Sequence, residues 1–264
     1  MKSMLITGAA SGIGAAIAHE FANRGWQVYA IDICEIPSLE NTVGYKADIT
    51  NENEISAIAS CLQEQGVVLD LIINVAGIHR MASLVESDFA VMKKLTEVNL
   101  CGAMLVNRCF HSLLAPKGRI LIVTSEVAYL DPMPFNGLYS VSKTALECYA
   151  QALRQELNLL GQRVITIRPG AIETPLCSES VDATARLARE TQLYKRQAGR
   201  FSGIAAKFMG KPMKPAMLAK TVYRAATAKR PRAVYKKHLN LGLVLLNLLP
   251  IKLQCAIIKM LLNR

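Results

Sequence analysis

The sequence predicts an α/β protein, a doubly wound parallel sheet that forms one domain over residues 1–264 and carries an apolar helical extension at the C-terminus. Two observations support this prediction: short β-branched runs alternate with segments of helical period, and no linker rich in Pro, Gly or Ser divides the chain. Strands and helices that alternate in this way build a parallel sheet with helices on both faces. With 52% apolar and 19% charged residues, the chain has a large core to bury and is neither disordered nor fibrous.

Five apolar runs are predicted to be strands: Met4 to Thr7, Gln27 to Ile31, Leu69 to Asn74, Arg119 to Thr124 and Arg163 to Arg168. After the first run, Ile13, Ile17 and Phe21 recur every four residues, which is typical of a helix with one apolar face. A second helix of this kind is predicted over residues 55–62. Because ligands of parallel sheets bind beyond the carboxyl ends of the strands, the residues after each run are the candidates for function.

The alternation of strand and helix ends near Gly170. A polar stretch and then a helical segment follow, so we expect residues 175–230 to form a lid over the substrate. Arg232 to Lys236 is predicted to be a last strand. Residues 239–262 are predicted to form two apolar helices divided by Pro250.

Charge is distributed unevenly along the chain. Residues 1–194 hold 15 Lys and Arg against 20 Asp and Glu, whereas residues 195–264 hold 16 Lys and Arg and no acidic residue. A basic segment of this kind can face nucleic acid, an anionic membrane, an acidic substrate or solvent. Nucleic-acid binding is disfavoured because aliphatic rather than aromatic residues lie between the basic ones.

The seven cysteines include no C-x-x-C pair and indicate neither a disulfide framework nor a zinc site, so no metal is expected. The chain enters its first strand at Met4 without an apolar segment long enough for a signal peptide. We therefore expect reduced thiols and a cytoplasmic protein, with membrane association left open by the C-terminus.

A glycine-rich turn, T-G-A-A-S-G-I-G from Thr7 to Gly14, lies between the first predicted strand and the first predicted helix. Glycine permits a tight turn and lets a phosphate approach the backbone N–H groups at the positive end of the helix. At this place in the chain, the turn favours a nucleotide site over a purely structural turn.

Asp32 follows the second predicted strand, where a carboxylate can accept hydrogen bonds from the adenosine ribose and repel a 2′-phosphate. No Lys or Arg lies in the glycine-rich turn or directly after Asp32, so the sequence favours NAD over NADP. Asp48 and Ile49 are expected to flank the adenine, although an Asp in a loop is also a common turn former.

Tyr139 and Lys143 are four residues apart in a segment of helical period, so their side chains share one face. An ammonium about 5 Å away, at an effective dielectric constant near ~20, contributes ~3 kcal/mol, or a little over ~2 pKa units. We therefore expect Lys143 to lower the pKa of the Tyr139 phenol towards neutrality, helped by the charge of oxidised nicotinamide. Since this spacing arises by chance in most proteins, the neighbouring motifs decide its meaning.

Those motifs are N-V-A-G from Asn74 to Gly77, V-N-L around Asn99, Ser125 after the fourth strand, Y-S-V-S-K from Tyr139 to Lys143, and R-P-G ending at Gly170. With the glycine-rich turn, and over about residues 1–176, they resemble the short-chain dehydrogenase/reductase family. The resemblance implies a Rossmann-type sheet that binds NAD(P), hydride transfer between nicotinamide and an alcohol or carbonyl carbon, and a homodimer or homotetramer.

The resemblance also assigns roles to residues. It makes Tyr139 the general acid and base, while Lys143 lowers its pKa and binds the nicotinamide ribose. Ser125 would orient the substrate carbonyl and Asn99 would complete a proton relay through water. Together with Tyr139 and Lys143, the residues expected to bind the cofactor, NAD, are Gly8, Ser11, Gly12, Ile13, Gly14, Asp32, Asp48, Ile49, Asn74, Ala76, Gly77, Pro169, Gly170, Ile172 and Thr174.

Two departures from the family pattern affect these expectations. Val75 stands where many members have Asn, and one residue more than usual separates Ser125 from Tyr139, which reshapes the substrate wall. The segment before Tyr139 and the basic, apolar C-terminus resemble members that act on steroids, retinoids and other lipophilic alcohols. The sequence thus predicts an NAD-dependent oxidoreductase for a secondary alcohol or ketone, such as a hydroxysteroid. The alternative is a non-catalytic dinucleotide sensor or scaffold.

The C-terminal segment has two interpretations. Its second helix places Lys252 and Lys259 on one face and Leu253, Ile257 and Met260 on another. The apolar face either caps the substrate cleft or a subunit groove, or rests in a membrane interface where basic side chains meet anionic lipid. A spanning role is excluded because the uncharged stretch at 239–251 reaches about 20 Å as a helix, against a hydrocarbon core of ~30 Å.

Overall fold

Seven parallel strands form one sheet in the order β3-β2-β1-β4-β5-β6-β7. The computed structural model describes residues 1–208 and 211–263, so residues 209 and 210 of the expected lid lie outside the described part. The strands are β1 (Ser3–Thr7), β2 (Gln27–Asp32), β3 (Thr42–Lys46), β4 (Leu69–Asn74), β5 (Leu114–Val123), β6 (Arg163–Pro169) and β7 (Val234–Lys237). The strand order reverses between β1 and β4, which confirms the predicted doubly wound α/β fold.

Helices connect the strands. The α-helices are α1 (Gly12–Ala22), α2 (Glu52–Glu64), α3 (Phe89–Thr96), α4 (Gly102–Phe110), α5 (Gly137–Leu159), α6 (Pro175–Glu190), α7 (Lys195–Phe208), α8 (Pro215–Thr227), α9 (Leu241–Asn247) and α10 (Ile251–Asn263). The short elements are the π-helical turn η1 (Glu97–Cys101) and the 3-10 turns η2 (His111–Leu113) and η3 (Glu126–Ala128).

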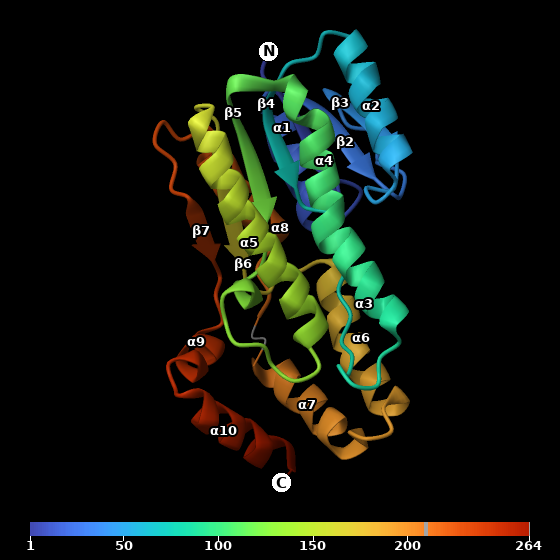
Figure 1. Cartoon of the computed structure of the whole chain (residues 1–264), viewed down its shortest axis with the longest axis vertical. Coiled ribbons are helices and arrows are strands. Elements are labelled where there is room, and N and C mark those ends of the chain that lie inside the picture. Colours follow the sequence, from blue (N-terminus) through green and yellow to red (C-terminus); the bar gives the residue numbers. More distant parts are fainter. Residues whose placement is uncertain (209–210, 264) are drawn as a thin grey trace.

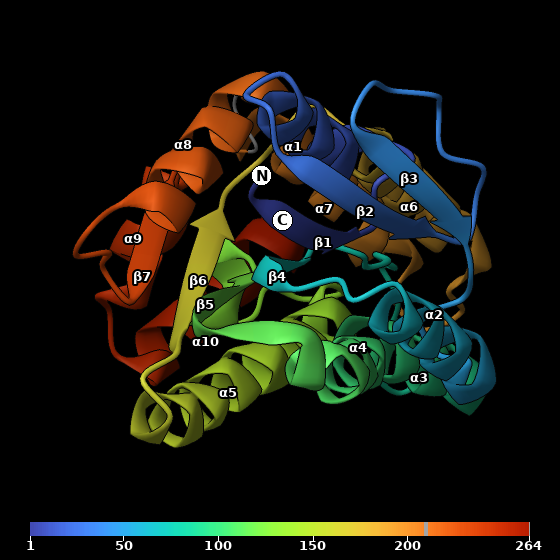
Figure 2. The same cartoon turned by 90° about the horizontal axis from the view of Figure 1, so that it is seen from above.

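The sheet has a core on each face because alternate side chains of a strand point to opposite sides. In β1, Met4 and Ile6 pack beneath α1 and α8, whereas Leu5 packs beneath α2, α4 and α5. Figure 2 shows these two layers of helices on either side of the sheet. The alternation between strand and helix in the sequence therefore becomes a three-layer sandwich.

The carboxyl ends of the strands all point to one end of the molecule, where α6, α7, α9 and α10 gather (Figure 1). Leu187 of α6, Phe201 of α7 and Leu262 of α10 share one small core with Phe135. The two predicted C-terminal helices are present and are separated at Pro250. Helical elements thus cover the edge of the sheet where ligands of this fold bind.

The strands differ from the prediction chiefly at β3 and β5, and the predicted last strand, Arg232 to Lys236, is found as β7 (Val234–Lys237). β3 was not predicted, because Thr42–Lys46 contains Gly44, has no buried side chain and becomes a strand only by pairing with β2 at the sheet edge. β5 begins at Leu114 rather than Arg119, since its first residues pass through Pro116 and Gly118, which normally interrupt strands.

Candidate active site

A cavity of about 300 Å³ lies beyond the carboxyl ends of β1, β2 and β4. It brings together eleven of the residues expected to bind the cofactor: Gly8, Ser11, Gly12, Ile13, Gly14, Asp32, Asp48, Ile49, Ala76, Gly77 and Thr174. We call it the nucleotide cavity. Its position at the reversal of strand order is where this fold class binds dinucleotides.

The glycine-rich turn fits tightly between the strands and α1. A Cβ atom at Gly8, whose φ is +72°, would lie 2.8 Å from the backbone of Ala76, and one at Gly14 would lie 1.8 Å from the carbonyl oxygen of Gly8. Ser11 caps α1 without a side-chain hydrogen bond, so the first N–H groups of the helix have no partner from this residue. Such a cradle fits a pyrophosphate at the positive end of the helix.

Asp32 forms the acidic edge of the nucleotide cavity. Its carboxylate oxygens accept hydrogen bonds of 2.9 Å from the backbone N–H groups of Ala10 and Cys34, which fixes the carboxylate against the glycine-rich turn. Lys46, opposite Asp32 on β3, is paired with Glu35 at 3.0 Å. This nearby cation therefore already has a carboxylate partner.

Asp48 closes the far side of the same cavity. Burial acts to raise the pKa of its carboxyl, but hydrogen bonds from Thr50 and the charge of Lys94 outweigh burial and hold that pKa below its usual value. The ammonium of Lys94 lies 3.6 Å from the Asp48 carboxylate. Lys94 is a lining residue that the sequence interpretation did not single out.

Asn74, expected to bind the cofactor, lines neither cavity of the site. Its side-chain amide is buried and donates to Asn107 at 2.8 Å, and Asn107 in turn donates to the Tyr149 hydroxyl at 3.1 Å. These contacts join β4 to α4 and α5. The side chain therefore has a structural role in the protein, and cofactor contact by Asn74 stays a prediction.

Ser125, Tyr139 and Lys143 come together beyond the end of β5. Ser125 follows the strand and caps η3, accepting a hydrogen bond from the N–H of Val127 at 3.4 Å. Tyr139 and Lys143 lie in the first two turns of α5, and the Lys143 ammonium is 5.8 Å from the centre of the Tyr139 ring. Lys143 is buried, with 4% of the residue exposed. Its ammonium donates a hydrogen bond to the carbonyl of Val123 at 3.5 Å.

The expectation that Lys143 lowers the pKa of the Tyr139 phenol is wrong when the protein groups act alone, without the charge of nicotinamide. Burial raises the pKa of the Tyr139 phenol to about 12, with a hydrogen bond to Ser125 acting in the opposite direction. Burial also lowers the pKa of Lys143 to about 8. Desolvation disfavours both charged forms, and the sequence-based estimate omitted this cost. At neutral pH Tyr139 therefore holds its proton and can act as an acid.

Asn99 lies in the π-helical turn η1 and is almost fully buried. Its amide donates to the carbonyl of Ile78 and to the Ser142 hydroxyl, both at 2.9 Å, and its oxygen accepts from the N–H of Ile78 at 2.8 Å. Ser142 in turn donates to the carbonyl of Tyr139 at 2.8 Å. Asn99 thus connects the strand end after β4 to the first turn of α5, and its part in a proton relay stays a prediction.

Gly77 lies close to the side chains of Asn99 and Lys143, which leave little room for a side chain at this position. A Cβ atom at this position would lie 3.0 Å from the Asn99 side-chain oxygen and 3.2 Å from the Lys143 ammonium. Both polar groups therefore approach the same point at the junction of the two cavities. A larger residue would require Asn99 or Lys143 to shift by a few tenths of an ångström.

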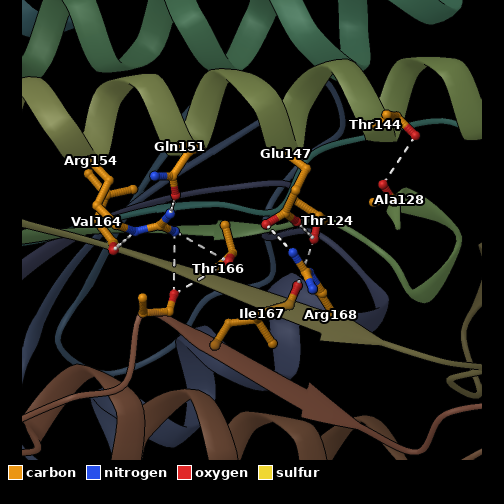
Figure 3. A network of polar contacts seen from close by, with 11 residues as sticks. Thr124, Ala128, Thr144, Glu147, Gln151, Arg154, Val164, Thr166, Ile167 and Arg168 are labelled. Carbon is orange, nitrogen blue, oxygen red and sulfur yellow. Dashed lines mark hydrogen bonds and ion pairs between the residues drawn. The ribbon is translucent and has the colours of Figure 1, made fainter. Parts of the chain in front are cut away.

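A mostly buried ion pair, with side chains 14% and 16% exposed, holds three elements of the site together (Figure 3). Glu147, one turn beyond Lys143 on α5, accepts from Arg168 of β6 and from the Thr124 hydroxyl, both at 2.9 Å. Burial acts to raise the pKa of Glu147, but these two hydrogen bonds outweigh it and keep the pKa low. The pair therefore fixes the residue before Ser125 relative to the helix that carries Tyr139.

A second cavity, of about 770 Å³, contains three of the four catalytic candidates, Ser125, Tyr139 and Lys143, whereas Asn99 lines neither cavity. We call it the substrate cavity. Pro169, Gly170 and Ile172 line it, as does Thr174, which also lines the nucleotide cavity. Most of the outer wall comes from α9 and α10: Gly242, Leu243, Leu245, Leu246, Leu248, Leu249, Ile257, Ile258 and Leu261. The C-terminal helices thus cap the substrate cleft, one of the two alternatives that the sequence left open.

The sequence interpretation did not assign a role to four polar residues of this cavity, His79, Glu126, Asn136 and Asn240. The His79 ring lies edge-on to Tyr139 with 4.6 Å between the ring centres and is hydrogen-bonded to Asn136 at 2.9 Å. Glu126 accepts from the N–H of Asn240 at 2.6 Å. His79 and Glu126 follow the ends of β4 and β5, so the rule that sites lie beyond strand ends could have found them.

One cavity contains the glycine-rich turn, and the adjoining cavity contains Ser125, Tyr139 and Lys143. These features are typical of one class of protein, the oxidoreductases that bind a nicotinamide dinucleotide beside their substrate. Residues 2–185 match the family described as short chain dehydrogenase. The chain belongs to this family, as the sequence motifs had indicated.

Two curated relatives show how far the similarity extends. An NADPH-dependent 1-acyldihydroxyacetone phosphate reductase of Schizosaccharomyces pombe is 33% identical over 186 residues, which are 67% of this chain and 62% of that protein. The match thus covers less than two thirds of that relative. A 1-hydroxy-2-glutathionyl-2-methyl-3-butene dehydrogenase of a Rhodococcus species is 28% identical over 184 residues, 68% of this chain and 81% of that protein.

Solved structures of the same family share the fold. A short-chain dehydrogenase from Streptomyces avermitilis has a TM-score of 0.76 at 19% identity, covering 98% of this chain and 95% of its own. One from Burkholderia cenocepacia, in complex with NADP, has a TM-score of 0.73 at 22% identity over 99% of both chains. At such identities, the likeness shows the fold alone.

Proposed function

We propose that this protein is an NAD-dependent oxidoreductase that transfers a hydride between nicotinamide and a secondary alcohol or ketone on a lipophilic skeleton, such as a hydroxysteroid. The observation that carries the proposal is the position of Tyr139, Lys143 and Ser125 in an apolar cavity that shares Gly77 and Thr174 with the nucleotide cavity. A nicotinamide ring at this junction would lie between the cofactor cradle and the substrate.

The chain's own residues would supply the proton and the orientation. When bound, the nicotinamide supplies or accepts the hydride at the substrate carbon. In the direction of reduction, the Tyr139 hydroxyl gives its proton to the carbonyl oxygen, which the Ser125 hydroxyl holds in place. Because burial raises the pKa of Tyr139 to about 12, this proton is present at neutral pH. The Lys143 ammonium would bind the nicotinamide ribose and, in alcohol oxidation, stabilise the phenolate.

The preference for NAD is supported by Asp32. A 2′-phosphate on the adenosine ribose would face this carboxylate, and the cations Lys46 and Lys94 are already paired with Glu35 and Asp48. The relative from Schizosaccharomyces pombe is named as NADPH-dependent, so both cofactors belong in the test. The electrostatic argument predicts that NAD(H) is the better cofactor.

The lipophilic substrate is supported by the wall of the substrate cavity. α9 and α10 contribute leucine and isoleucine side chains to it, and its volume of about 770 Å³ lies within the range of small-molecule sites. The Schizosaccharomyces pombe relative is named for an acylated dihydroxyacetone phosphate, which supports an acylated substrate as a further candidate.

The proposal includes a homodimer or homotetramer and a peripheral membrane contact through the basic, apolar C-terminus. Exposed apolar side chains on the outer helices, such as Met104 of α4 and Val141 of α5, support helix pairing between subunits. None of the described helices is long and apolar enough to cross a bilayer. Light scattering on the purified protein measures the oligomeric state.

A substrate screen tests the proposal. Ketones and alcohols of steroids, retinoids, acylated dihydroxyacetone phosphate and sugars, with acyl thioesters as a further class, are offered with NAD(H) and with NADP(H), and the absorbance of the reduced nicotinamide is followed. We expect turnover of at least one lipophilic alcohol or ketone. Tight binding of NADH without turnover of any compound would support the sensor or scaffold instead.

A further inference from the structure

The segment from α9 to α10 also exposes apolar side chains to solvent, at the rim of the substrate cavity and beside it. Leu241, Leu248 and Ile251 are 73%, 75% and 71% exposed, and Leu253 and Met260 are exposed as well. Single exposed leucines are ordinary, whereas Leu241, Leu245 and Leu248 recur at the spacing of one helix face and exposed Ile251 and Leu253 follow within five residues, a density that indicates a contact surface. We call these five residues, with Met260, the outer face.

The outer face surrounds an opening of the substrate cavity. Leu245 and Leu248 line that cavity and are also 64% and 75% exposed. A side chain can have both properties only at the rim of an opening. The cavity that contains Tyr139 therefore opens at α9 onto an apolar surface rather than onto a polar one.

The same helices are held beside the catalytic loop. Glu126, next to Ser125, accepts from the N–H of Asn240 at the start of α9, and Asp131 accepts from the Gln254 side chain of α10 at 2.9 Å. The opening is therefore fixed relative to the reacting groups.

The charged residues around the outer face indicate which kind of partner covers it. Lys252 and Lys259 are exposed on α10, and no acidic residue occurs from residue 195 onward. The carboxylate of Asp131 lies beside α10 and accepts a hydrogen bond from the Gln254 side chain of that helix. Apolar side chains flanked by lysines match an anionic bilayer surface, where leucines enter the interface and lysines meet the headgroups.

We propose that the outer face docks on an anionic lipid bilayer and that the substrate, a lipid alcohol or ketone dissolved in that bilayer, enters at Leu245 and Leu248. The membrane contact and the oxidoreductase activity belong to the proposed function, and the route of entry rests on both. The helices lie in the interface without crossing it, in agreement with the finding that no described helix can span a bilayer.

The first test measures binding to vesicles. Full-length protein is sedimented with vesicles of phosphatidylcholine alone or mixed with phosphatidylserine. We expect binding to the anionic vesicles and its loss in the triple variant Leu241→Gln, Ile251→Gln, Leu253→Gln, whose residues do not line the substrate cavity. Lys252→Gln with Lys259→Gln should lower binding about 30-fold, since each lysine near the surface contributes roughly fivefold.

Matched controls change exposed residues away from the outer face. Val68→Gln, Leu159→Gln and Leu160→Gln remove three equally exposed apolar side chains, and Lys117→Gln with Lys220→Gln remove two exposed charges. Both controls should bind anionic vesicles like the wild type. Thermal melting confirms that every variant is folded, and light scattering shows whether the triple variant has lost a subunit contact instead.

The second test measures the route of entry. One steroid ketone that the enzyme reduces is presented either dissolved in anionic vesicles or complexed with cyclodextrin in vesicle-free buffer. The triple variant should lose at least tenfold in rate with the vesicle form and keep its rate with the cyclodextrin form. Equal loss with both forms, no binding of the wild type to anionic vesicles, or an altered oligomer without altered vesicle binding would overturn the inference. Vesicle binding without any turnover would reject the proposed activity and the entry route, but not the docking surface.

Discussion

Buried charge at single residues sets the chemistry of this site. Lys143 is nearly inaccessible to solvent, and burial lowers its pKa from 10.5 to about 8. Among the described protein groups, its ammonium has one hydrogen-bond acceptor at 3.5 Å, the carbonyl of Val123. A buried lysine held in this way destabilises the folded protein, because the unfolded chain solvates the same charge fully.

Replacing Lys143 with Met should therefore stabilise the protein while it removes activity. The shift from 10.5 to about 8 corresponds to about 3 kcal/mol in the free energy of unfolding. Below about pH 8 the group is charged in both states and the full gain is expected. Between about pH 8 and 10.5 the unfolded wild type binds more protons than the folded one. The stability of the wild type therefore rises with pH in this range, and the difference in stability between the variant and the wild type disappears. Urea unfolding without nucleotide measures this. Lys117→Met is the exposed control, and a destabilised Lys143→Met would contradict the argument.

Asp32 should control the choice of cofactor. We expect kcat/KM with NAD(H) to exceed that with NADP(H) by roughly 100-fold, about 3 kcal/mol. Asp32→Asn keeps one acceptor for the backbone N–H groups but removes the charge, so the ratio should fall about tenfold or more, mainly through better use of NADP(H). Asp88→Asn, at another backbone-capping aspartate, should leave the ratio unchanged. A wild type that prefers NADP(H) would show that Asp32 has been misinterpreted.

Among the secondary-structure elements, the junction of β1 and α1 is the most constrained. The carbonyl oxygen of Gly8 would lie 1.8 Å from a Cβ atom at Gly14, so the helix can start here only with glycine. Such contact brings the positive end of α1 close to the sheet and creates the cradle for the pyrophosphate.

Gly14→Ala should prevent folding or lower stability by more than about 4 kcal/mol, because backbone atoms must move. Gly199→Ala is the matched control: this glycine is also in a helix, α7, and nothing lies within 4 Å of the added Cβ. It should be neutral or stabilising by up to about 1 kcal/mol. Thermal melting compares the two, and similar melting temperatures would contradict the described geometry of the turn.

The ion pair between Glu147 and Arg168 joins α5 to β6 below the catalytic residues. Glu147→Gln should cost about 3 kcal/mol of stability, because it leaves a mostly buried guanidinium without its counter-charge. In Glu20→Gln the partner, Arg24, has a solvent-exposed guanidinium, so the loss of stability should be much smaller. Urea unfolding at pH 7 distinguishes the two variants. Equal losses would mean that the buried pair contributes no more than a surface pair.

Sequence patterns predicted the elements that have their own apolar signature. The runs that became β1, β2, β4 and β6 are continuous and apolar, so their positions were predicted within a residue or two. β3 has no buried side chain and depends on its pairing with β2, which a local pattern does not contain. The polar stretch expected as a lid became α6 and α7, which are held by Phe135 and α10 from distant parts of the chain.

The sequence motifs predicted which residues lie in the site better than they predicted the burial and the pKa values of those residues. The positions of Ser125, Tyr139 and Lys143 follow from their spacing, whereas the direction of the Tyr139 pKa shift depends on burial that no spacing reveals. The hydrogen bond from the Asn74 side chain to Asn107 was not foreseen, and cofactor contact by Asn74 stays a prediction. Contacts between distant segments, such as Glu147 with Arg168, also lay beyond the sequence patterns.

At the scale of the whole molecule, the acidic and basic parts of the chain contribute differently. Residues 1–194 build six of the seven strands, the nucleotide cavity and the catalytic candidates, and the basic residues 195–264 add β7 and much of the apolar wall of the substrate cavity. The family match ends at residue 185, before α7 to α10. Substrate class is therefore expected to depend on residues after 185, which lie outside the family match and line much of the substrate cavity.

The most direct test of the account is the rate of nicotinamide-coupled turnover by Tyr139→Phe, measured beside its affinity for NADH by fluorescence. The substitution removes the transferable proton and keeps the ring against His79. We expect turnover to fall by at least about 10²–10⁴-fold, while NADH binds within a few-fold of wild type. Turnover within tenfold of wild type would contradict the assignment of Tyr139 as the acid and base.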